Sequence, residues 1–294
     1  MTLLKTVSTL DIPALRFGER EAIRMLAKAG FDGCDWSMFT YTRPDGFFNR
    51  PDWREEAKVF KKIADENHIP FLQAHAPFPS DVPGDPDATA KIREYLLLSL
   101  EACSLVECPY VIIHPVDSFP SAVDPMMREE AYRLNVEFYG SLIPRARELG
   151  VRICLENMFG HNRRYDRIVP RGFSTAEEMA KCIDELSGGI DACLDVGHAV
   201  LVNDTMDHMV RVLGPRLKTL HVHSNDGVHD RHTAPLVHPM DWESFGKALY
   251  DIGFTGAITL EADNFLVPLP DDMIQLGLEF LAANARYVAS LVKP

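Results

Sequence analysis

No run of about 18 consecutive apolar residues occurs in the sequence, so we expect no membrane-spanning helix. The N-terminal segment also lacks the charged stretch followed by an apolar run that marks a secretory signal peptide. The six cysteines include no Cys-x-x-Cys pair, and Cys154 and Cys193 lie inside apolar runs, as buried free thiols do. These absences predict a protein of the reducing cytoplasm.

Positive charge is in deficit as well. The 294 residues include 30 Lys and Arg against 43 Asp and Glu, which gives a net charge of −13. Nucleic acid and anionic membranes both require a basic face, so this chain is a poor partner for either. No Gly-x-Gly-x-x-Gly motif follows a predicted strand, which argues against a dinucleotide-binding sheet.

What the chain does have is a regular alternation of short apolar runs and longer amphipathic segments. Almost wholly apolar runs are typical of strands buried on both faces of a parallel sheet. We predict strands over residues 3–9, 31–37, 70–75, 109–114, 150–156, 190–195, 217–223 and 256–261. We predict helices over residues 18–30, 52–68, 87–106, 124–150, 174–188, 200–214, 241–253 and 271–292. Eight such units in 294 residues predict an α/β fold, a single (β/α)8 TIM barrel domain over 1–294, with an open doubly wound sheet as the alternative.

Ionisable residues lie at or near the ends of most predicted strands, and the carboxyl ends of barrel strands carry the chemistry. These residues are Asp35, His75, His114, Glu156, Asp195, His223 and Glu261. An apolar strand that ends in a buried ionisable residue is costly unless that residue is paired or binds a metal. The last four residues of the set come from consecutive strands. They form an oxygen-rich group that suits Mn²⁺, Mg²⁺ or Co²⁺ better than a closed structural zinc site.

Histidine is concentrated after the seventh predicted strand. The segment LHVHSNDGVHDRH, residues 220–232, holds four of the eleven histidines and two aspartates. Imidazoles and carboxylates at this density point to a metal site or a substrate-binding loop, with Asp230 and His232 as candidates.

The stretches GFDGCDW, CLENMFG, CLDVGHA, LHVHSNDGVHDRH and ITLEAD resemble the sugar-phosphate isomerase/epimerase family. Its superfamily, the xylose-isomerase-like TIM barrels, also holds tagatose 3-epimerase, hydroxypyruvate isomerase, inosose dehydratase and endonuclease IV. The resemblance implies one divalent metal ion (Mn, Co, Mg or Zn) and no organic cofactor. It places the metal ligands at Glu156, Asp195, His223 and Glu261 and leaves His221 outside the ligand set. Homodimers and homotetramers are common among similar barrels.

The resemblance also implies an activity, the isomerisation or epimerisation of a sugar, keto-sugar or sugar phosphate. In this chemistry the metal stabilises an enediolate, and the two glutamates, Glu156 and Glu261, act as the acid/base pair. His198 and Arg231 are the expected contacts to the substrate. In the basic segment HNRRYDR, Arg163 and Arg164 are candidates for binding a phosphate.

Two further readings stay open. Endonuclease IV binds three zinc ions, and the residues that resemble its ligands here are His75, His114, Glu156, Asp195, His198, His223, Asp230, His232 and Glu261. A multinuclear zinc phosphodiesterase is therefore an alternative, although the acidic chain disfavours a DNA substrate. An inosose-type dehydratase would use the same metal and bases. The tagatose-type epimerases carry a further glutamate where this chain has Asn162, which weakens the assignment to free ketohexoses.

Overall fold

A parallel β-barrel forms the centre of the computed structural model, which describes residues 3–116, 125–162 and 166–294. The sheet is eight-stranded within these residues, in the order β10-β1-β2-β3-β4-β5-β8-β9. The strands are β1 (Lys5–Thr9), β2 (Gly33–Ser37), β3 (Phe71–His75), β4 (Tyr110–Ile113), β5 (Arg152–Glu156), β8 (Ile190–Asp195), β9 (Leu217–His221) and β10 (Ala257–Leu260). The ring closes through a parallel bridge between Val222 and Leu260, where the Val222 amide donates to the Thr259 carbonyl at 2.8 Å.

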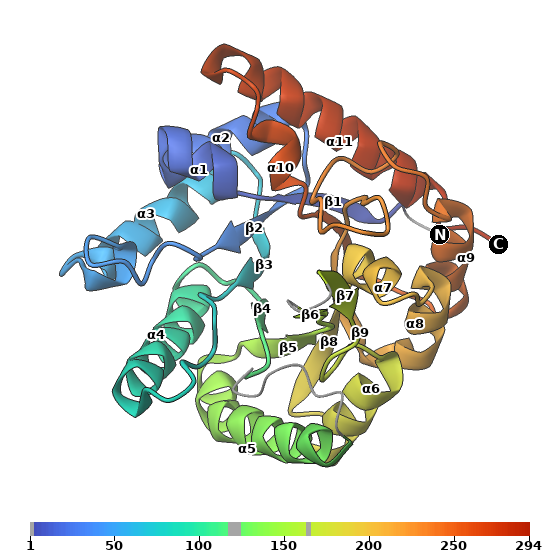
Figure 1. Ribbon diagram of the computed structural model, residues 1–294. Coiled ribbons are helices and arrows are strands. Elements are labelled where there is room, and N and C mark those ends of the chain that lie inside the picture. The colour runs from blue at the N-terminus through green and yellow to red at the C-terminus, as the bar shows by residue number, and fades with distance from the viewer. Residues whose placement is uncertain (1–2, 117–124, 163–165) are drawn as a thin grey trace.

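Helices surround the barrel on the outside (Figure 1). They are α1 (Asp11–Phe17), α2 (Glu19–Ala29), α3 (Trp53–Glu66), α4 (Pro86–Leu105), α5 (Pro125–Leu149), α6 (Ala176–Glu185), α7 (Val196–Leu201), α8 (Met206–Leu213), α9 (Trp242–Asp251), α10 (Asp263–Leu266) and α11 (Ile274–Ser290). Each of the larger helices buries one apolar face on the sheet, as Ala22, Ile23 and Leu26 of α2 illustrate. The predicted (β/α)8 architecture is confirmed, and the strand boundaries differ from the prediction by at most two residues.

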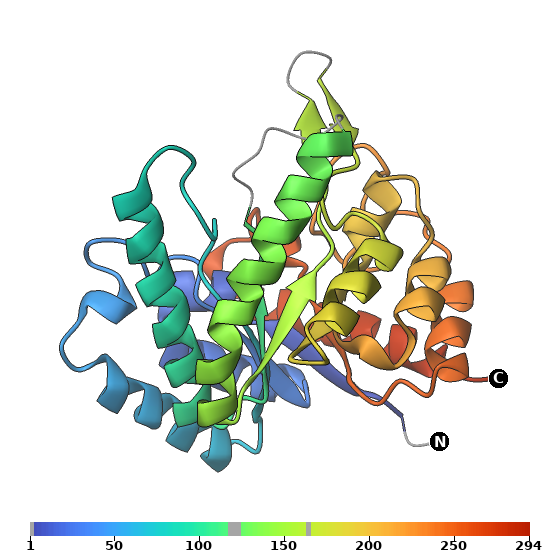
Figure 2. The ribbon, with the colours of Figure 1, turned by 90° about the horizontal axis from the view of Figure 1, so that it is seen from below.

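Some local elements differ from the sequence prediction. The predicted helix over 200–214 covers the end of α7 and the whole of α8, because the chain leaves the helical conformation at Asn203, which has a left-handed φ of 62°. Asp195 caps the start of α7 by accepting a hydrogen bond from the His198 amide at 2.7 Å. The chain then turns, and Thr205 caps α8. After β5, an antiparallel hairpin of β6 (Gly160–Asn162) and β7 (Arg167–Val169) was not foreseen. This hairpin projects beyond the carboxyl ends of the strands (Figure 2).

None of the helices in the described parts of the chain combines the length and the apolar character that crossing a membrane requires.

Candidate active site

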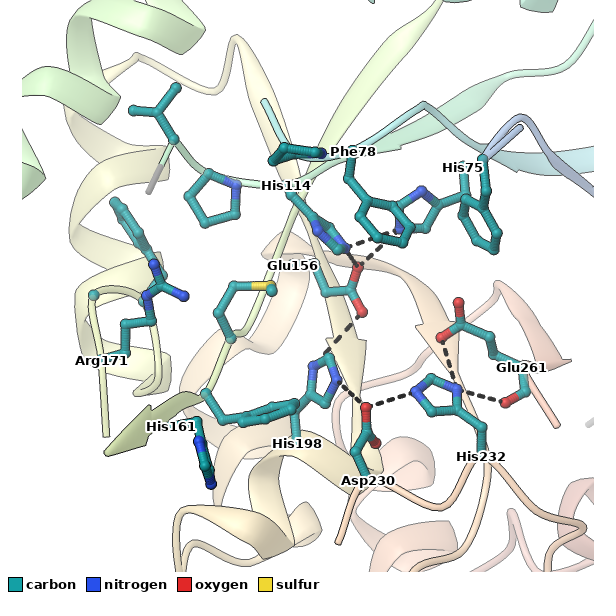
Figure 3. Close-up of a pocket in the computed structure, with 18 of the residues that line it drawn as sticks. His75, Phe78, His114, Glu156, His161, Arg171, His198, Asp230, His232 and Glu261 are labelled. Atoms are coloured by element: carbon teal, nitrogen blue, oxygen red, sulfur yellow. Dashed lines mark hydrogen bonds and ion pairs between the residues drawn. The ribbon is translucent and has the colours of Figure 1, made fainter. Parts of the chain in front are cut away.

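A cavity of about 560 Å³ opens at the carboxyl ends of the strands (Figure 3). This volume lies within the usual range for small-molecule sites. The polar residues among those that line it are Asp11, His75, His114, Asn135, Glu156, His161, Arg171, His198, Asp230, His232, Glu261, Asp263 and Asn264. Most of the strand-end residues selected from the sequence therefore converge on one cavity.

Glu156, at the end of β5, lies at the base of this cavity among several imidazoles. Its Oε2 lies 3.1 Å from Nε2 of His114 and 3.4 Å from Nε2 of His75. The two histidine nitrogens are themselves 3.0 Å apart. Burial opposes ionisation of Glu156, but His221, His114 and His75 outweigh it and hold the pKa of this carboxyl well below its usual range. Glu156 is therefore a carboxylate that can bind a cation.

Three buried carboxylates and one imidazole come close enough to share a metal ion. Ligand atoms of Glu156, Asp195, His221 and Glu261 all lie within 4.8 Å of one another. Nδ1 of His221 links two of the carboxylates, at 2.9 Å from Oε1 of Glu156 and 3.2 Å from Oε2 of Glu261. His221 therefore lies among the candidate ligands, although the resemblance leaves it outside the ligand set.

His223, the ligand expected from the resemblance, lies beside Asp195. Its Nε2 is 3.1 Å from each carboxylate oxygen of Asp195. Residues two apart in an extended segment face the same side, so His221 and His223 both point into the barrel, one layer apart. Gly197 makes room for His223, because a Cβ at this position would overlap its imidazole ring.

A third group of residues also lines the cavity. Nε2 of His232 is 2.9 Å from Oδ2 of Asp230, and Nε2 of His198 is 3.6 Å from the same oxygen. Ligand atoms of these three residues also lie within 4.8 Å of one another. Burial lowers the pKa of His198, but Asp195 and Asp230 outweigh it and raise that pKa to about 10. The same kind of pairing raises the pKa of His232 well above its usual value.

The donors fit a divalent cation. Asp230 Oδ1 is buried without a hydrogen-bond partner among the described residues. Such atoms are rare in folded proteins unless water or an ion satisfies them. Apart from Arg171, no Arg or Lys of the described chain lines the cavity, and the groups that favour the ionised form of Glu156 are histidines. Carboxylate and imidazole donors suit Mn, Co, Mg or Zn.

The other residues selected from the sequence lie elsewhere. The guanidinium of Arg231 pairs with Asp226 at 2.8 Å and lies outside the lining of the main cavity. Arg163 and Arg164 lie outside the described residues. Asp35 does not line the cavity; its Oδ2 lies 3.6 Å from Nε2 of His221 and accepts a hydrogen bond from Gln73 at 2.7 Å.

Sequence reasoning missed two features of the cavity. Arg171 follows the unforeseen hairpin and lines the cavity, and nothing in the residues around it marks it as a site residue. Asp11 and Asp263 also line the cavity beside Glu261, and burial raises the pKa of both carboxyls. The signal for Asp263 was its place two residues after a strand-end glutamate.

Comparison with known proteins agrees with the fold. A sequence model of the family described as xylose isomerase-like TIM barrel matches residues 23–284. A curated relative, D-psicose 3-epimerase of Agrobacterium fabrum (strain C58), is 27% identical over 137 residues, which are 47% of this chain. The match spans only 44% of that relative's length.

Two solved structures with a similar fold are named for different activities. D-psicose 3-epimerase with D-tagatose from Clostridium cellulolyticum H10 has a TM-score of 0.73 and 18% identity, covering 97% of this chain and 99% of that chain. AP endonuclease, family 2, from Brucella melitensis has a TM-score of 0.68 and 13% identity, covering 96% and 99%. At these identities the likeness concerns the fold alone.

Proposed function

The chain belongs to the xylose isomerase-like TIM barrel family, and we propose that it is a divalent-metal-dependent isomerase or epimerase of a sugar, keto-sugar or sugar phosphate. One observation carries this proposal. Glu156 and Glu261, from strands that are not neighbours in the sheet, meet at one nitrogen of His221 on the floor of the cavity. The similarity to D-psicose 3-epimerase supports the same chemistry.

Glu156, Asp195 and Glu261 would hold the metal together with His223 or His221. A divalent ion bound there supplies a Lewis acid, which makes a C–H bond next to a carbonyl more acidic. Glu156 and Glu261 are the groups of the chain that remove and return this proton. Both carboxyls are buried, so little water competes for the proton during the transfer.

The remaining wall residues would position the substrate. His198 and His232 line the cavity, where their imidazoles can bind sugar hydroxyls. Phe39 and Phe78 pack edge to face, with ring centroids 5.1 Å apart, and both line the cavity. Their rings offer an apolar surface for the carbon face of a sugar.

The test is metal content followed by solvent exchange. Protein purified without chelator and without a nickel column is analysed for bound elements. We expect one Mn, Co, Mg or Zn per chain. We also expect deuterium from D₂O to enter a ketose or ketose phosphate at the carbon next to the carbonyl. Absence of exchange with every ketose and phosphate in the metal-loaded protein would refute the proposal.

A second candidate function is a multinuclear zinc phosphodiesterase. The specific observation in its favour is the pair of extra metal-binding groups, His75 with Glu156 and His221, and His198 with Asp230 and His232. Two or three zinc ions per chain, with hydrolysis of a phosphodiester, would support it. His232→Ala separates the candidates: the isomerase keeps its metal and binds substrate more weakly, whereas the multinuclear site loses at least one ion.

A further inference from the structure

The cavity has two chemically different walls. One carries the carboxylates and imidazoles described above. The other is largely apolar and includes Val116, Ala131, Met158, Phe159 and Phe173. Arg171 stands in this apolar wall and is the one Arg or Lys among the described lining residues. It lies on the opposite side of the cavity from Glu261 and His232 (Figure 3).

The backbone that carries Arg171 is fixed to the floor of the site. The Arg171 amide donates to Oγ of Ser174 at 2.6 Å, and this hydroxyl donates to the Met158 carbonyl at 2.6 Å. The Met158 amide donates in turn to the Phe173 carbonyl at 3.1 Å. Because Met158 lies two residues after Glu156, the turn at 171–174 is held against the segment that carries a proposed catalytic base.

The same turn includes an unusual backbone conformation. Phe173 has a φ of 61°, a left-handed value that non-glycine residues rarely adopt. Its amide donates to Oε2 of Glu178 in α6 at 2.7 Å. Residues kept in this region by surrounding contacts are often found beside functional sites. These contacts fix the backbone from which the Arg171 side chain extends.

A guanidinium in an apolar wall has a cost. Burial lowers the pKa of Arg171, and the carboxylate of Asp81 acts in the opposite direction. An arginine remains protonated in proteins, so the charge persists in the wall. Its planar guanidinium presents N–H donors in a fork that matches the oxygens of a carboxylate or a phosphate.

We propose that Arg171 binds an oxyanion of the substrate, a carboxylate or a phosphate monoester, at the end remote from the reacting carbon. This inference rests on the proposed function only for the position of that carbon. The substrate would then span the cavity, with its reacting carbon at the glutamates and its oxyanion at the apolar wall. Arg171 takes the role that the sequence suggested for Arg163 and Arg164.

Direct binding tests the proposal without relying on turnover. Three matched probes are titrated calorimetrically into the metal-loaded protein: D-fructose, D-fructose 6-phosphate and D-fructuronate. Arg171→Gln should weaken binding of at least one anionic probe about tenfold to a hundredfold, which is the range for a charge-assisted pair. D-Fructose should bind with unchanged affinity. The anionic probe that responds identifies phosphate or carboxylate as the natural group.

Two further variants serve as controls. Arg171→Lys keeps the charge but not the fork, so it should restore part of the lost affinity. Arg133→Gln removes an arginine of α5 whose side chain is 74% exposed and should change nothing. If Arg171→Gln weakens all three probes equally, or leaves both anionic probes unaffected while the variant melts as wild type does, the proposal is wrong. If anion binding depends on Arg171 but no ketose or ketose phosphate exchanges deuterium in the metal-loaded protein, the proposed isomerase function fails and the oxyanion site stands.

Discussion

Strand β5 begins at Arg152 and ends at Glu156, and the two residues meet different surroundings. At the amino end, Nε of Arg152 pairs with Oδ2 of Asp191 at 2.7 Å, and a second nitrogen donates to the Gly188 carbonyl at 2.9 Å. At the carboxyl end, the ion-pair partners of Glu156 among the described residues are imidazoles, each charged only when protonated. The first pair is complete in itself, whereas the second group lacks a permanent positive charge.

This difference separates stability from function along one strand. A complete Arg–Asp pair at the closed end of the barrel has no capacity for a further ligand. Where histidines compensate the carboxylates, the protons on the imidazole nitrogens can be replaced by a metal ion, because the metal competes with H⁺ for the same nitrogen. Ionisable residues at the carboxyl ends of barrel strands therefore indicate chemistry, and those at the amino ends indicate stability.

The largest effect is expected from neutralising a base at the carboxyl end. Glu156→Gln or Glu261→Gln should reduce deuterium exchange by at least about a hundredfold, the scale of a lost general base. Exchange is measured at saturating metal, and bound metal is quantified in each variant, so that lost affinity is not mistaken for lost catalysis. Near-normal exchange in either variant would contradict a mechanism with two bases.

A smaller effect should follow from crowding one histidine. Gly197→Ala would push the imidazole of His223 away from Asp195, so metal affinity should fall about tenfold to a hundredfold. The metal affinity is measured by competition with a chelator of known affinity. The matched control is Gly140→Ala in α5, where the new Cβ would make an ordinary contact 3.7 Å from Leu186. Unchanged affinity in Gly197→Ala would identify His221, rather than His223, as the imidazole ligand.

The sequence predicted the barrel well because buried parallel strands are short, apolar and regularly spaced. It also selected Glu156, Asp195 and Glu261, because an ionisable residue that ends an apolar strand stands out, and the structure brings ligand atoms of these three within 4.8 Å of one another. The choice between His221 and His223 was not decided by the pattern, since residues two apart share one face of a strand. Arg171 was not found, because it reaches the cavity from a loop whose path depends on the β6–β7 hairpin.

The carboxyl end of β5 lacks a permanent positive charge, so the stability of the metal-free protein should depend on pH. Asp195 and Asp230 raise the pKa of His198 to about 10, although burial lowers it, so the folded pKa exceeds the unfolded value of about 6.5. The stabilisation is then complete below pH of about 6.5 and is lost as the pH rises through about 10. We expect the melting temperature of chelator-treated protein to fall over this interval.

Two comparisons sharpen the pH experiment. His198→Gln should reduce the fall in the metal-free protein, since one of the imidazoles with a raised pKa is gone. Metal-loaded wild type should fall less, because deprotonated imidazoles bind the ion more tightly as the pH rises. A metal-free protein whose melting temperature rises between these pH values would show that the imidazoles of the site are not held protonated by their carboxylates.

The smallest effect is expected at the amino end of the same strand. The Arg152 side chain is 43% exposed while that of Asp191 is 9% exposed, so solvent screens the pair in part. Arg152→Gln should lower the free energy of unfolding by about 1 kcal/mol, measured by urea denaturation. Asp191→Asn and the double variant complete a cycle that isolates the pair from the bond to Gly188.

Deuterium exchange should remain at the wild-type rate in all three variants, because the pair lies at the opposite end of β5 from Glu156. A large loss of exchange with little loss of stability would mean that the two ends of the strand are coupled.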